Sequence, residues 1–176
     1  MSINHFSYLA LTLASLVFML HDKIVYAQPK EPINIEADNA KIIEKEGKSI
    51  YTGNVLLIQG NIRLTADKLV VQSSKGKLVQ ITAQGSPVTY SEKSSTPHTD
   101  ITGEAEILEY YATDDRILLL NNAKLSQGGT TFGGNRIEYN TATDIVTAEV
   151  SNTGKERVQV TIQPDNTSKT LNPAPH

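Results

Sequence analysis

The stretch IYTGNVLLIQGNIRLTADKLVVQ, residues 50–72, decides the fold. Apolar and polar side chains alternate in its second half, from Ile62 to Thr65, whereas Val55 to Ile58 are apolar at every position. A period of two residues with many β-branched side chains is typical of β-strands. Gly60-Asn61 predicts a tight turn and Ala66-Asp67 a corner, so the stretch is predicted to form strand, turn, strand, corner and strand.

Similar corners recur along the chain at intervals of roughly 30 residues, which indicates a stack of β units. The corners are predicted at Asp38, Asp67, Glu104 and Gly134, and a break between strands is predicted at Gln84–Pro87. Each corner carries a small residue that lets the backbone bend. The prediction is an all-β open jelly-roll or sandwich of bent antiparallel strands, without helices after the N-terminal leader.

The two ends of the chain differ from its middle. Residues 1–27 contain the apolar run Phe6–Leu20 and end in small residues at Val25-Tyr26-Ala27, which fits a secretory signal peptide and a periplasmic location. An uncleaved membrane anchor is the alternative, although the run is shorter than the about 20 residues that span a bilayer. Residues 28–163 are predicted as one β domain, and residues 164–176 as a disordered tail.

The composition leaves little material for catalysis or for metal binding. The net charge is −3, which argues against nucleic acid as a partner. The chain has no cysteine and four histidines, of which only His98 lies inside the predicted domain away from the ends. Asp38, Asp67 and Glu104 are interpreted as turn residues rather than as a glycosidase pair. We therefore expect that the protein binds no cofactor and no metal and that it is not an enzyme.

Alternate side chains of the predicted strands point to one face, and most of them are aliphatic. This pattern fits an ordinary packed core, and it also fits a groove for acyl chains, which offer no polar group to bind. The candidates for the lipid-binding groove are Ile33, Ile35, Val55, Leu57, Ile62, Leu64, Leu69, Tyr90, Leu108, Tyr110, Leu125 and Ile137.

Several blocks of sequence carry a family resemblance. They are YTGNVLLIQGNIRLTADKLVV (residues 51–71), INIEAD (33–38), GSPVTY (85–90), GEA (103–105) and GNRIEY (134–139). In this order they resemble the OstA-like LptA family of periplasmic lipopolysaccharide-transport proteins. The resemblance implies an open β jelly-roll that holds the acyl chains of lipid A. It also implies head-to-tail homo-oligomers and edge-strand pairing with LptC-like inner-membrane and LptD-like outer-membrane proteins. The candidate joining ends are Ile33–Ala37 and the strands near Val146 and Val158.

Three functions remain open at this stage. The first is a soluble bridge that conducts lipopolysaccharide from the inner to the outer membrane. The second is an adaptor of the same fold that stays anchored in the inner membrane, as LptC-like proteins do. The third is a β protein that binds or processes envelope polysaccharide, which would call for surface aromatic residues; the chain has no tryptophan.

Overall fold

The computed structural model describes residues 31–95, 99–150 and 157–163. Its strands are β1 (Asn34–Glu36), β2 (Asn39–Ile43), β3 (Lys48–Gln59), β4 (Ile62–Ser74), β5 (Lys77–Glu92), β6 (Ile101–Tyr111), β7 (Arg116–Gln127), β8 (Thr130–Asn140), β9 (Ile145–Glu149) and β10 (Gln159–Ile162). Within these ranges the helical structure is limited to the 3-10 turn η1 (Glu44–Glu46). The predicted leader, the predicted tail and His98 lie outside the described residues.

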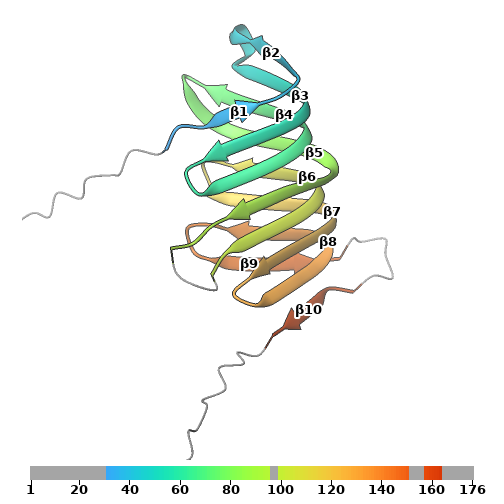
Figure 1. Cartoon of the computed structure of the whole chain (residues 1–176). Helices are drawn as coiled ribbons and strands as arrows, with labels where there is room; N and C mark the ends of the chain where they lie inside the picture. Colours follow the sequence, from blue (N-terminus) through green and yellow to red (C-terminus); the bar gives the residue numbers. More distant parts are fainter. Residues whose placement is uncertain (1–30, 96–98, 151–156, 164–176) are drawn as a thin grey trace, which may run out of the picture. The chain divides into compact units, whose positions relative to one another are not determined.

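The described strands form a single antiparallel sheet in the order β1-β3-β4-β5-β6-β7-β8-β10, with β2 also paired to β3 and β9 to β8. Consecutive strands from β3 to β8 are neighbours, so tight hairpins connect most of them. At two of these turns, Lys75-Gly76 and Gly128-Gly129, both residues have positive φ, as type I′ hairpins require. The sheet does not close on itself (Figure 1). The predicted all-β antiparallel fold is confirmed.

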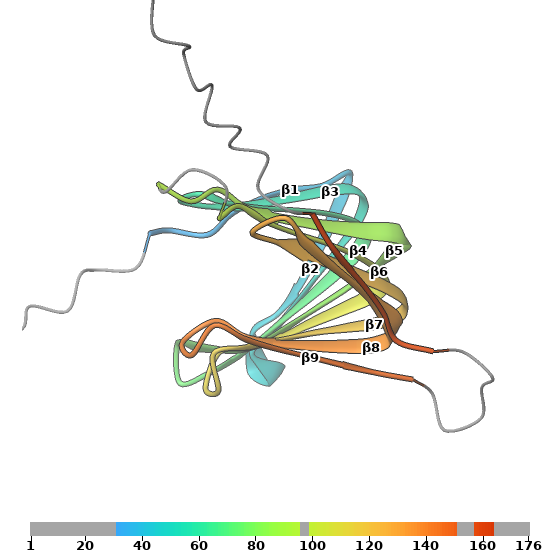
Figure 2. The ribbon, with the colours of Figure 1, turned by 90° about the horizontal axis from the view of Figure 1, so that it is seen from below.

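Each strand from β3 to β8 bends near its middle, and the sheet therefore folds into two arms (Figure 2). The first arm comprises residues 34–36, 55–65, 88–92, 101–104, 123–133 and 159–162, and the second comprises residues 39–52, 68–84, 107–120 and 136–149. The chain passes back and forth between the arms. We call the open side opposite the bends the mouth; hairpin turns form both of its rims.

Residues with positive φ and hydrogen bonds between side chains stabilise the bends. In β3, Gly53 and Asn54 have φ of 81° and 45°, and the Asn54 amide donates to Asp38 Oδ2 at 2.8 Å. A Cβ on Gly53 would lie 2.3 Å from that carboxylate oxygen, so only glycine fits there. The arrangement recurs in β7, where the Asn122 amide donates to Glu106 Oε1 at 2.7 Å. The corner acids thus tie neighbouring bends together.

The structure differs from the predicted strands in three details. The corner predicted at Ala66-Asp67 is present as a register shift between Thr65 and Lys68, but the stretches on its two sides form the single strand β4 instead of two strands. Gln84–Pro87 likewise bends β5 without breaking it. The corner predicted at Glu104 lies at Ala105-Glu106. Gly and Asn mark a bend inside a strand as readily as a turn between two strands, because both need an unusual φ.

The apolar core lies between the arms, on the inner face of the sheet. Its most buried side chains, Leu69, Leu108, Leu119, Leu125, Ile137, Val55 and Val88, come from all six long strands. Ala83, Ala105 and Ala123 are also buried and sit near the bends, where the arms converge. Small side chains there let the two arms approach closely, and Gly103 of the first arm faces Leu119 of the second.

Candidate functional site

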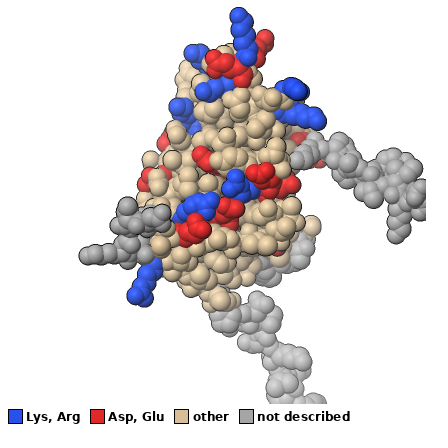
Figure 3. All heavy atoms as spheres, turned by 180° about the vertical axis from the view of Figure 1, so that it is seen from behind, with Lys and Arg blue, Asp and Glu red and all other residues tan. Residues whose placement is uncertain are grey.

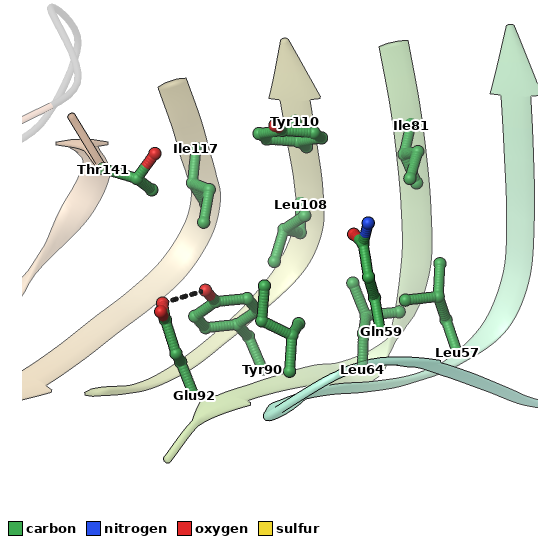
Figure 4. A pocket seen from close by; sticks show the side chains of 11 residues that line it. Leu57, Gln59, Leu64, Ile81, Tyr90, Glu92, Leu108, Tyr110, Ile117 and Thr141 are labelled. Carbon is green, nitrogen blue, oxygen red and sulfur yellow. Dashed lines mark hydrogen bonds between the residues drawn. The ribbon is translucent and has the colours of Figure 1, made fainter. Parts of the chain in front are cut away.

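An apolar cavity of about 270 Å³ opens between the arms toward the mouth. Its walls are Leu57, Gln59, Ile62, Leu64, Tyr90 and Glu92 from the first arm and Ile81, Leu108, Tyr110, Ile117 and Thr141 from the second. Side chains from the two arms point toward one another across it (Figure 4). Aliphatic side chains make up most of the wall, and the polar groups gather at the rim, so the cavity suits an apolar chain with a polar end outside.

All twelve candidate groove residues lie on the inner face and belong to the core or pack against it. Six of them line the cavity: Leu57, Ile62, Leu64, Tyr90, Leu108 and Tyr110. The other six lie elsewhere: Val55, Leu69, Leu125 and Ile137 are buried in the packed core, and Ile33 and Ile35 lie at the β1 edge. Their lipid-binding role remains a prediction.

Five residues that line the cavity were not among the candidates: Gln59, Ile81, Glu92, Ile117 and Thr141. Alternation could have found Gln59 and Glu92, which follow Leu57 and Tyr90 by two positions on the same face. Ile117 opens a run that is apolar at every position, so its parity is ambiguous. Thr141 lies in a turn, where alternation has no meaning.

Two tyrosine hydroxyls on the inner face donate to carboxylates near the rims. Tyr90 Oη donates to Glu92 Oε2 at 2.8 Å, and Tyr139 Oη donates to Asp144 Oδ1 at 3.0 Å. Burial, followed by the neighbouring carboxylate, raises the pKa of both tyrosines well above the ordinary value. Both therefore stay neutral donors at physiological pH, and the polar ends of these side chains are satisfied inside an apolar interior.

The outer surface carries charges of both signs. On the face in Figure 3, basic side chains predominate toward the top of the view, and basic and acidic side chains are mixed lower down. On β8, Arg136 Nη2 lies 2.7 Å from Glu138 Oε2 and Arg136 Nη1 lies 2.8 Å from Glu149 Oε2. These ion pairs neutralise charge locally around Arg136.

In the part of the chain that the structure describes, no group of three or more His, Asp or Glu side chains could hold a metal ion. The same ranges contain no helix that is long and apolar enough to cross a membrane.

Residues 34–145 match the family model of the LptA/(LptD N-terminal domain) LPS transport proteins. The chain belongs to this family. Because these are transport proteins, the prediction that the chain is not an enzyme is confirmed.

Individual relatives agree with the family assignment. The lipopolysaccharide export system protein LptH of Pseudomonas aeruginosa is 33% identical over 143 residues, which cover 77% of this chain and 81% of LptH. LptA of Escherichia coli K12 is 32% identical over 112 residues, 62% of this chain and 60% of LptA. The crystal structure of LptH, described as the LptA-homologous periplasmic component of the lipopolysaccharide transport device, superposes with a TM-score of 0.71 at 29% identity and covers 76% of this chain and 96% of that one.

Proposed function

We propose that the protein carries lipopolysaccharide across the periplasm, with acyl chains of lipid A held in the cavity between the arms. The observation that carries this proposal is the open apolar cavity in a member of a lipopolysaccharide-transport family. Each methylene moved out of water gains about 0.8 kcal/mol, so a shielded path removes most of the cost of crossing an aqueous compartment. The sugars and phosphates remain outside the mouth, in water.

Photo-crosslinking tests this assignment directly. A benzoyl-phenylalanine at Leu64, which faces the cavity, is expected to capture lipopolysaccharide as a mass-shifted band. The same probe at Arg63, the next residue of β4 and on the opposite face, is the matched control and is expected to capture none. Equal capture at both positions, or capture at Arg63 alone, would contradict the proposal.

We also propose that the ends of the sheet join to neighbouring molecules by strand pairing, to further copies of this chain, to an LptC-like protein and to an LptD-like protein. The support is the row of apolar side chains that the terminal strands leave in water. Ile42 of β2 is 65% exposed, and Ile162 of β10 is 73% exposed. An unpaired edge with such side chains invites another strand.

A charge at either end is expected to weaken this association. Ile42→Lys and Ile162→Lys are expected to lower the concentration-dependent mass in light scattering, because a neighbour would bury the new charge. Thr82→Lys adds the same charge to the middle of the sheet and is expected to leave the mass unchanged. A wild-type protein that stays monomeric up to its solubility limit would overturn the stacking proposal.

We further propose that residues 1–27 are removed on export and that the mature protein is periplasmic. The intact mass of the protein from a periplasmic fraction is then expected to correspond to a chain that begins at Gln28. A full-length chain found in the inner-membrane fraction would favour the anchored adaptor instead.

A further inference from the structure

The two rims of the mouth touch near the C-terminal end of the sheet. Gln127 ends β7 on the rim of the first arm, and Asp144 lies in the β8–β9 turn on the rim of the second arm. Gln127 Nε2 donates a hydrogen bond to Asp144 Oδ1 at 2.6 Å, across the mouth. We call this contact the clasp.

The turn that carries Asp144 is held in one shape. Asn140 Oδ1 accepts hydrogen bonds from the backbone N–H and from the hydroxyl of Thr143, at 2.8 and 2.9 Å. Thr141 anchors the turn to its neighbour, because its N–H and its hydroxyl both donate to the carbonyl of Asp115. Asp144 itself has φ of 59°, a left-handed conformation that Asp tolerates. The turn therefore fixes the position of the Asp144 carboxylate on the rim.

Below the clasp the interior is filled. Tyr139 lies under Asp144 and donates to the same oxygen at 3.0 Å. Leu119, Leu125 and Ile137 of the same strands are at most 1% exposed. The contrast is with the cavity, which lies mainly over β3 to β6 and reaches only Ile117 of β7 and Thr141 on the C-terminal side. The groove thus has an open N-terminal part and a C-terminal part that is both filled and joined at its rims.

We propose that the clasp between Gln127 and Asp144 is a gate that controls passage along the groove toward the C-terminal edge. The inference rests on the proposed function. A lipid whose sugars project through the mouth cannot pass a point where the rims are joined, so the clasp must open first. The contact is exposed, and water can replace either partner, so it opens and recloses readily. Asp144 also directly precedes edge strand β9, so a neighbouring molecule whose strand pairs with β9 would form its hydrogen bonds next to the gate.

A reversible lock tests the gate. The chain has no cysteine, so Gln127→Cys and Asp144→Cys together introduce the only two thiols, and a short bis-methanethiosulfonate links them. The matched control is Gln127→Cys with Thr130→Cys, which are paired across β7 and β8 on one rim and leave the mouth free. Purified lipopolysaccharide is added, and benzoyl-phenylalanine probes report at Leu64, in the cavity, and at Phe132, on the inner face between the clasp and β10.

If the clasp is a gate, the cross-link between positions 127 and 144 leaves capture at Leu64 unchanged and abolishes capture at Phe132. Reductant restores capture at Phe132. The control cross-link between positions 127 and 130 changes capture at neither position. Unchanged capture at Phe132 in the locked protein would overturn the gate, and so would loss of capture at Leu64. Failure of the unlocked protein to capture lipid at Leu64 would count against the proposed function instead. The yield of the cross-link then tests the clasp by itself. If the reagent bridges the control cysteines at 127 and 130 but not those at 127 and 144, the two rims are not in contact and the clasp is ruled out.

Discussion

The interior next to the bends and the interior next to the mouth lie on the same face of the same strands, yet they differ in packing. Ala83 of β5 has no exposed surface, whereas Ile81, two residues earlier on that face, lines the open cavity. The distance between the arms accounts for the difference, because the arms converge at the bends and diverge toward the mouth. Stability is therefore expected to come from the bend side, and lipid binding from the mouth side.

The largest expected effect is a loss of packing at the bend side. Leu69 has no exposed surface and lies in the core of the second arm. Leu69→Ala removes that packing where neighbouring strands cannot collapse inward, and is expected to lower the free energy of unfolding by about 3 kcal/mol. Urea denaturation followed by circular dichroism measures it. If Leu69→Ala lowered the free energy of unfolding no more than a substitution of a cavity residue does, the bend side would not be the more stabilising region.

Overpacking the bend side is expected to cost somewhat less. A Cβ on Gly103 would lie 3.2 Å from Leu119 Cδ1, across the narrow gap between the arms. Gly103→Val adds two further methyl groups there and is expected to cost about 2 kcal/mol of unfolding free energy. The double variant Gly103→Val with Leu119→Ala makes room and is expected to recover part of the loss. Equal stability of wild type and Gly103→Val would show that the arms are not close at this point.

Shortening a side chain that lines the cavity is expected to weaken lipid binding more than it lowers stability. Ile62 is half-buried and lines the cavity, so Ile62→Ala is expected to lower the free energy of unfolding by only about 1 kcal/mol. Lipopolysaccharide binding is expected to weaken by about fivefold, since the residue leaves a gap beside an acyl chain. Denaturation and a fluorescent lipopolysaccharide-displacement assay on the same sample separate the two effects. A stability loss as large as that of Leu69→Ala, with normal binding, would contradict the division.

The smallest effect is expected on the outer face. Arg136→Ala removes ion pairs to Glu138 and Glu149 that remain partly in water, and is expected to lower the free energy of unfolding by about 0.5 kcal/mol. The loss should shrink further in high salt. Unchanged lipopolysaccharide binding is the second expectation, and reduced binding would place the outer face in the transport path.

The period of two predicted the strands and the inner face, because side chains of a strand alternate whatever the tertiary structure. Leu64 and Leu125 illustrate where this information ends. Both were predicted to line a groove and both face inward, but only Leu64 borders the cavity. Alternation fixes the face that a side chain occupies, and it contains nothing about the distance to the opposite arm.

Two further features lay beyond sequence patterns for related reasons. The bend of β5 at Gln84–Pro87 was predicted as a break, because the same Gly and Pro signals serve both. Gln127 and Asp144 belong to different turns, and only the approach of the rims brings them within a hydrogen bond. Polar residues in turns are usually solvated, so nothing in their local sequence marks them as partners.

The most direct test of the central claim is a methyl NMR experiment on protein labelled at the isoleucine δ1 positions and loaded with lipopolysaccharide. Ile62, Ile81 and Ile117 line the cavity, whereas Ile137 is buried on the same inner face with no exposed surface. The account predicts nuclear Overhauser contacts from acyl-chain methylenes to the first three methyls and none to Ile137. Contacts at Ile137, or none at the three cavity methyls, would contradict it.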